Sequence, residues 1–142
     1  MQFVDRTKSL QQLDGKDWGE PTYFSSLVVE CHRLRRIRLN DFTIENLRIM
    51  ISQKINLEYL IPIALEHLHS NPLVEGKYYP GDLLDAVVKT TDEFWLSYPE
   101  LRDEVAAIAK KSTSLFVYDP DECNDSWRKD ILLFVEKCSK IS

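Results

Sequence analysis

Apolar residues recur at intervals of three and four positions along most of this chain, and this spacing constrains the fold more than any other feature. The clearest stripe lies near the C-terminus, at Cys123, Trp127, Ile131, Phe134, Val135 and Cys138. Only the segment SLFVY (114–118) has the extended character of a strand or a packed loop. The pattern therefore predicts an all-α fold, a helical bundle of about five or six helices joined by short connections.

The expected helices can be placed approximately from the same spacing. We expect helices over about 24–36, 43–54, 56–69 and 80–90, a further helix beginning at Pro99, and a long last helix after residues 119–122. Residues 9–13 and Asp92–Ser97 are expected to form short turns, and 14–23 an ordered loop. The segment Asp119–Glu122 resembles a capping box for the last helix.

Individual residues indicate where some helices begin. Thr43 is a suitable cap for the helix over 43–54, and Asn56 is a possible cap for the next one. Because proline kinks a helix interior, Pro62 predicts an irregular first turn, with regular helix starting near residue 62. Pro80 is expected to be the first residue of its helix.

Length and composition are those of one ordinary domain. The chain has 142 residues, 44% of them hydrophobic, so residues 1–142 are expected to form a single domain with a real core. No segment resembles a secretion signal or a membrane span, and we expect a cytoplasmic protein that does not bind membranes. Three dispersed cysteines are expected to be reduced and to act as small hydrophobic side chains.

Charge is distributed unevenly. Residues 1–71 contain nine acidic and nine basic side chains, whereas residues 72–142 contain fourteen acidic and nine basic ones and so carry the whole net charge of −5. Phosphates would be repelled by this second half, which is better suited to a basic protein partner.

No motif for catalysis or cofactor binding is present. The histidines His32, His67 and His69 are not at metal-ligand spacing, and no cysteine has a recognisable histidine partner. Glycine-rich phosphate-binding fingerprints are absent. We therefore expect no enzyme, no cofactor, no metal and no small-molecule substrate.

Two other features have alternative interpretations. The arginines at 33, 35, 36 and 38 can bind nucleic acid, or they can pair with Asp41, Glu45 or the acids of the 14–20 loop; we favour pairing. The loop aromatics Trp18, Tyr23, Tyr78 and Tyr79 can pack back onto the core. Together with neighbouring acids such as Asp82, they can also form the centre and rim of a protein interface.

Several long stretches resemble the immunity proteins of contact-dependent growth inhibition systems. They are DGKDWGEPTY (14–23), CHRLRRIRLNDFTIENLRIMISQ (31–53), IPIALEHL (61–68) and NPLVEGKYYPGDLLDAVV (71–88). The resemblance covers about residues 9–110. It implies a cytosolic, non-enzymatic protein that binds and neutralises the toxic C-terminal domain of a contact-delivered effector, often a nuclease, and so protects the producing cell and its siblings.

The resemblance supplies no binding residues, so the candidates come from charge and exposure. We expect Asp119, Asp121, Glu122 and Asp125 to attract a basic toxin, and Trp18, Tyr78, Tyr79 and Asp82 to contact it. Direct nucleic-acid binding is not expected. The main alternative function is a helical adaptor or regulatory subunit for another protein; a small nucleic-acid-binding regulator is a weaker one.

Overall fold

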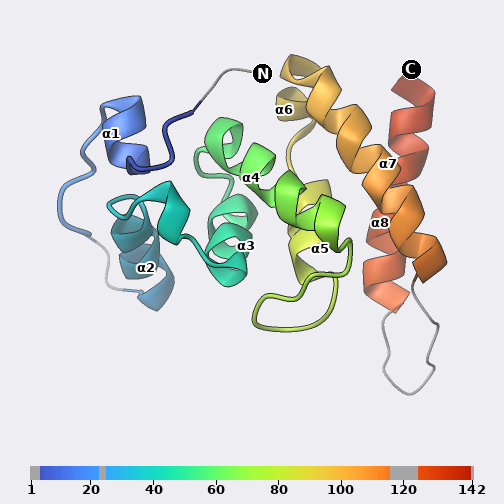
Figure 1. The fold of residues 1–142 in the computed structure, drawn as a ribbon, viewed down its shortest axis with the longest axis horizontal. Helices are drawn as coiled ribbons and strands as arrows, with labels where there is room; N and C mark the ends of the chain where they lie inside the picture. Colours follow the sequence, from blue (N-terminus) through green and yellow to red (C-terminus); the bar gives the residue numbers. More distant parts are fainter. Residues whose placement is uncertain (1–3, 23–24, 116–124, 142) are drawn as a thin grey trace.

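The computed structural model describes residues 4–22, 25–115 and 125–141, and within these ranges the fold is all-α (Figure 1). Its elements are α1 (Leu10–Asp14), α2 (Ser26–Leu34), the 3₁₀ turn η1 (Leu39–Asp41), α3 (Ile44–Ser52), α4 (Leu57–Ser70), α5 (Asp82–Val88), α6 (Asp92–Ser97), α7 (Pro99–Leu115) and α8 (Asp125–Ile141). No strand forms in the described ranges; backbone bridging is limited to two isolated pairs. None of the described helices is both long and apolar enough to cross a membrane.

The all-α prediction is confirmed, although the described part contains eight α-helices rather than five or six. The additional helices are α1 and α6, which the sequence suggested as turns. Each is capped by a side chain: Ser9 accepts a hydrogen bond from the Gln12 backbone N–H, and Thr91 accepts one from Phe94. Such capping satisfies backbone groups at the helix start and allows a very short helix to form.

Two proline predictions were wrong. Pro62 lies inside α4, which is helical from Leu57 onward. The buried face of α4, which includes Leu60, Ile61 and Ala64, stabilises the helix although proline cannot donate its backbone hydrogen bond. Pro80 precedes α5, which begins two residues later at Asp82.

The prediction of an extended segment at SLFVY (114–118) was also wrong for its first two residues. Ser114 and Leu115 are the last two residues of α7, and residues 116–118 lie outside the described ranges. The capping box suggested for 119–122 lies outside them as well. In contrast, Thr43 caps α3 as expected, in a reciprocal pair of hydrogen bonds with Asn46.

The helices pack around one core. In Figure 1, α7 and α8 lie side by side at one end, α1 and α2 lie at the other, and α3, α4 and α5 lie between them. Helix α5 is buried along its entire length and contacts α3, α4, α7 and α8. This central position makes α5 the structural support for the loop that precedes it.

The start of α5 is joined to the last helix by one close contact. The indole Nε1 of Trp127 donates a hydrogen bond of 2.8 Å to the carbonyl oxygen of Gly81. Gly81 has φ +91°, and a Cβ there would lie 2.7 Å from that indole nitrogen. Glycine is therefore required at position 81, for its backbone conformation and for the close approach of Trp127.

Candidate functional site

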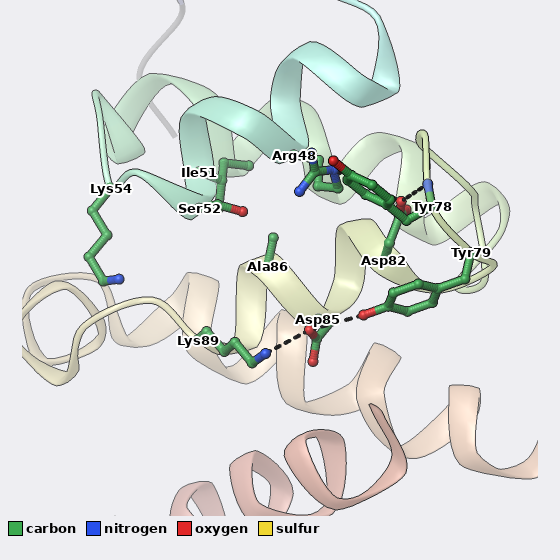
Figure 2. A pocket seen from close by; sticks show the side chains of 10 residues that line it. All are labelled: Arg48, Ile51, Ser52, Lys54, Tyr78, Tyr79, Asp82, Asp85, Ala86 and Lys89. Carbon is green, nitrogen blue, oxygen red and sulfur yellow. Dashed lines mark hydrogen bonds and ion pairs between the residues drawn. The ribbon is translucent and has the colours of Figure 1, made fainter. Parts of the chain in front are cut away.

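Tyr78 and Tyr79 lie on the connection between α4 and α5, at the edge of a pocket between α3 and α5 (Figure 2). The pocket has a volume of about 310 Å³, and Ile51 and Ala86 contribute its apolar lining. Tyr78 is 64% exposed and Tyr79 is 40% exposed. We call these two tyrosines and the adjoining pocket the tyrosine face. An exposed pair of aromatic side chains beside a pocket has the composition of a protein-binding hot spot.

The carboxylate of Asp82 fixes the backbone of the tyrosine loop. It accepts hydrogen bonds from the backbone N–H of Gly76 at 2.7 Å and from that of Tyr78 at 3.0 Å. Asp82 is also the first residue of α5, where the helix dipole favours a negative charge. Asp82 was expected to contact the toxin, but the residue is only 3% exposed and lies beneath the loop as its support.

Helix α3 fixes the same loop from the other side. Glu45 accepts a hydrogen bond of 2.8 Å from the Lys77 backbone N–H and two from the Arg48 guanidinium, at 2.7 and 2.6 Å. Hydrogen bonding to Arg48 lowers the pKa of Glu45, which keeps this acceptor ionised. The Arg48 guanidinium also lies 4.6 Å from the centre of the Tyr78 ring. Tyr78 is therefore held on one face by a cation–π contact while its other parts stay exposed.

Tyr79 is joined to a charge cluster in which Asp85 is nearly buried and Lys89 is 55% exposed. Its hydroxyl donates to Asp85 Oδ2 at 3.2 Å, and Lys89 Nζ lies 2.9 Å from the same carboxylate and 3.2 Å from Asp130 of α8. Burial raises the pKa of Asp85 and raises that of Tyr79 to about 12, so the phenol remains a donor at neutral pH. This cluster connects the tyrosine loop, α5 and α8.

Four residues that build this site were not predicted from the sequence as site residues: Glu45, Arg48, Asp85 and Lys89. Each acts in an ion pair that spans one helical turn, Glu45 with Arg48 and Asp85 with Lys89. Opposite charges three or four positions apart in a helix predict such ion pairs, so the pairs themselves could have been found in the sequence. Their support of the tyrosine loop could not, because it depends on how the helices pack in the folded protein.

Trp18 does not belong to the tyrosine face. It lies on the loop between α1 and α2, where the Arg35 guanidinium is 4.4 Å from its ring centre and the His32 ring packs edge-on at 5.2 Å. Arg35 is only 1% exposed. Trp18, itself 41% exposed, thus covers a buried arginine at the end of the molecule formed by α1 and α2.

The acidic candidates of the C-terminal part cannot be placed in full. Asp119, Asp121 and Glu122 lie outside the described residues. Asp125 is the first residue of α8, and the position of its side chain is likewise outside the description. Their role in binding stays a prediction.

The arginines at 33, 35, 36 and 38 are paired within the chain, as expected. Arg35 donates to Asp14 at 2.7 and 3.0 Å, to Asn56 and to the Lys16 carbonyl. Arg33 pairs with Glu30, and Arg38 pairs with Asp41. Arg36 donates to the Gly19 carbonyl and lies near Asp17 and Glu20. Glu45, also suggested as a partner, pairs with Arg48 instead. Asn56 occupies the cap position of α4, but its side chain serves the Arg35–Asp14 pair rather than capping the helix.

The described side chains offer little reactive chemistry. Within the described ranges, no group of three or more His, Cys, Asp or Glu residues is arranged to hold a metal ion. Burial raises the pKa of both Cys31 and Cys138, which favours the unreactive thiol form. Charged and aromatic groups at the tyrosine face are instead suited to recognising another molecule.

Comparison with known proteins gives one informative result. A family model described as CDI immunity proteins, where CDI is contact-dependent growth inhibition, matches residues 12–105. The matched region runs from α1 into α7 and includes the tyrosine face. A comparison with curated proteins finds no match. Because the family match extends over well more than half of the chain, this protein belongs to the CDI immunity proteins, which inhibit toxins and are not enzymes.

Proposed function

We propose that this immunity protein neutralises a nuclease toxin domain by binding it through the tyrosine face, while acidic side chains of the C-terminal part attract the toxin. In this proposal residues 1–142 act as one domain in the cytoplasm, where the delivered toxin would act. No nucleic acid, membrane lipid or small molecule is needed as a partner.

The observation that carries the proposal is the exposure of Tyr78 on a loop with fixed backbone. Tyr78 is 64% exposed, while its own backbone N–H and that of Lys77 are hydrogen-bonded to the carboxylates of Asp82 and Glu45, respectively. An aromatic anchor that is ordered before binding loses little conformational entropy when it becomes buried. Such preorganisation favours a high-affinity contact.

The nuclease class is supported by charge. A nuclease must present positive charge to its substrate, and this inhibitor has a net charge of −5 that resides in residues 72–142. Complementary charge accelerates association of an inhibitor with its target.

The proposal can be tested with the toxin domain encoded directly upstream of this gene. Tyr78→Ala should raise the dissociation rate of the complex about tenfold or more, as removal of a buried aromatic anchor does. Leu27→Ala on α2 is the matched control, because Leu27 is a large apolar side chain with 43% exposure away from the tyrosine face. Its dissociation rate should stay near wild type.

Trp18→Ala tests the location of the surface. If Trp18→Ala accelerates dissociation and Tyr78→Ala does not, the toxin binds the end of the molecule formed by α1 and α2, and the tyrosine face is not the binding site.

A further inference from the structure

A second and larger hollow lies away from the tyrosine face. It is a groove of about 1100 Å³, which we call the acidic groove, between residues 4–7, the first half of α4 and the junction of α6 with α7. The tyrosine face is built from α3, α5 and the loop before α5, so the two sites share no lining residue. None of the sequence features assigned above to toxin binding falls in the groove.

The groove has apolar walls. Tyr59 and Ile63 of α4 and Leu101 of α7 line it, together with Tyr98, which is 40% exposed. Leu96, on the neighbouring helix α6, is 67% exposed. An accessible tyrosine and a largely exposed leucine at this junction give it the apolar character of a protein contact surface.

The charged side chains that line the groove are mainly acidic. Asp5, Glu58 and Glu100 contribute carboxylates. Arg6 is the one cationic side chain among the described residues that line the groove, and it is engaged by Glu66. Among the described residues, neither Glu58 nor Glu100 has a cationic side chain within ion-pair distance, and both are exposed. These two carboxylates are therefore available to an incoming positive charge.

Charge and apolar character point to the class of occupant. The groove volume of about 1100 Å³ lies near the upper end of the range of about 300–1,000 Å³ that is common for small-molecule sites, which leaves room for a peptide segment. Negative potential disfavours nucleic acid and phosphate, whereas apolar walls with unpaired carboxylates suit a peptide segment that combines aliphatic side chains with lysine or arginine.

We infer that the acidic groove is a second docking site for the toxin domain, and that it receives a basic, partly apolar segment of that domain. This inference rests on the proposed function. Two separate contacts would make the inhibitor sensitive to the shape of its toxin as well as its charge, because both must be engaged in one geometry.

Charge reversal in the groove tests the inference. The double variant Glu58→Lys/Glu100→Lys should weaken binding of the purified toxin domain by about tenfold or more, because like charges would then face each other in the interface. The control Glu20→Lys/Glu136→Lys makes the same change in net charge at acids with 87% and 61% exposed side chains outside both sites. It should weaken binding no more than about threefold, through the general loss of attraction.

A second measurement needs no variant and so does not depend on the folding of the mutants. Hydrogen–deuterium exchange of the wild-type protein should slow at residues 57–63 and 97–101 when the toxin domain is bound. If wild type binds the toxin, the two double variants bind equally well and these segments show no protection, the groove inference is wrong while the proposed function survives. If wild type does not bind the toxin at all, both are wrong.

Discussion

The carboxylate of Asp82, in the first turn of α5, accepts a hydrogen bond of 3.0 Å from the backbone N–H of Tyr78, four residues earlier in the chain. A nearly inaccessible acid thereby positions a largely exposed aromatic ring. This relationship separates two roles that the sequence did not distinguish, since Tyr78 is available for contact and Asp82 is not.

Removal of the Asp82 carboxylate should loosen the tyrosine loop. Asp82→Ala is expected to lower the free energy of unfolding by about 2 kcal/mol, the usual loss for hydrogen bonds to a buried charged group. The amides of Gly76 and Tyr78 should exchange with solvent deuterium faster than in wild type. Glu75→Ala, an exposed acid in the same loop, is the control and should change neither quantity. Unchanged protection at Tyr78 in Asp82→Ala would contradict the role assigned to Asp82.

Lys89 should stabilise the cluster beneath Tyr79 in a pH-dependent way. Lys89→Met leaves the carboxylates of Asp85 and Asp130 without their shared cation, so we expect a loss of about 1–2 kcal/mol at pH 7, moderated because the lysine is 55% exposed. Burial raises the pKa of Asp85, and a carboxyl with a raised folded-state pKa becomes less destabilising as it protonates. The loss should therefore shrink between pH 7 and about pH 5.

Chemical denaturation of wild type and Lys89→Met at pH 7 and about pH 5 measures the loss in the free energy of unfolding. Lys137→Met is the control, because Lys137 is 64% exposed and lies 3.7 Å from an exposed acid, and its stability should match wild type. If the stability lost in Lys89→Met increases as the pH falls, this explanation is wrong.

The Arg35–Asp14 pair should contribute to stability in a different pH window. Hydrogen bonding to Arg35 lowers the pKa of Asp14, so its contribution is fully present above the unfolded value near 4 and is lost as pH falls through the lower folded value. Asp14→Asn should cost about 2 kcal/mol at pH 7, and less at about pH 3. Asp17→Asn, on the loop that follows Asp14 and with a 68% exposed side chain, should cost less than about 0.5 kcal/mol at either pH. Equal losses for the two variants would exclude a special role for the buried pair.

The sequence predicted the helices better than their starting points. Apolar spacing is set by burial, so α3, α7 and α8 could be recognised from it. The Pro62 prediction failed because packing of α4 outweighs the local cost of proline. The Pro80 prediction failed because Gly81, whose carbonyl is hydrogen-bonded to Trp127, is the cap residue and α5 begins at Asp82. In both helices tertiary contacts determine where the helix begins, and these contacts cannot be predicted from the local sequence.

The site was predictable only in part. Tyr78 and Tyr79 stand out in a loop sequence, and the structure places both beside a pocket. Glu45 of α3 supports the loop by accepting a hydrogen bond from the Lys77 backbone N–H, and Lys89 after α5 pairs with Asp130 of α8. Both contacts join segments that are far apart in the chain, so they could not be predicted from local sequence. Trp18 is also an aromatic residue in a loop, yet it covers Arg35 at the end of the molecule formed by α1 and α2 (Figure 1).

The acidic residues before and at the start of α8 should act on the association rate. Reversing Asp121, Glu122 and Asp125 to lysine is expected to slow association with a basic toxin and to flatten its salt dependence, with a smaller effect on dissociation. Binding kinetics at low and moderate salt measure both rates. If the folded triple variant associates as fast as wild type at low salt, these acids do not steer the encounter.

We propose that this protein inhibits a toxin by binding it directly. The most direct measurement is a titration of the purified toxin domain encoded immediately upstream with this protein, following nuclease activity and complex formation in the same samples. Activity should fall to background at a stoichiometric amount of inhibitor, in step with complex formation, and Tyr78→Ala should need a higher concentration for the same effect. A toxin that stays active at a large molar excess of the folded protein, with no complex formed, would exclude inhibition by direct binding.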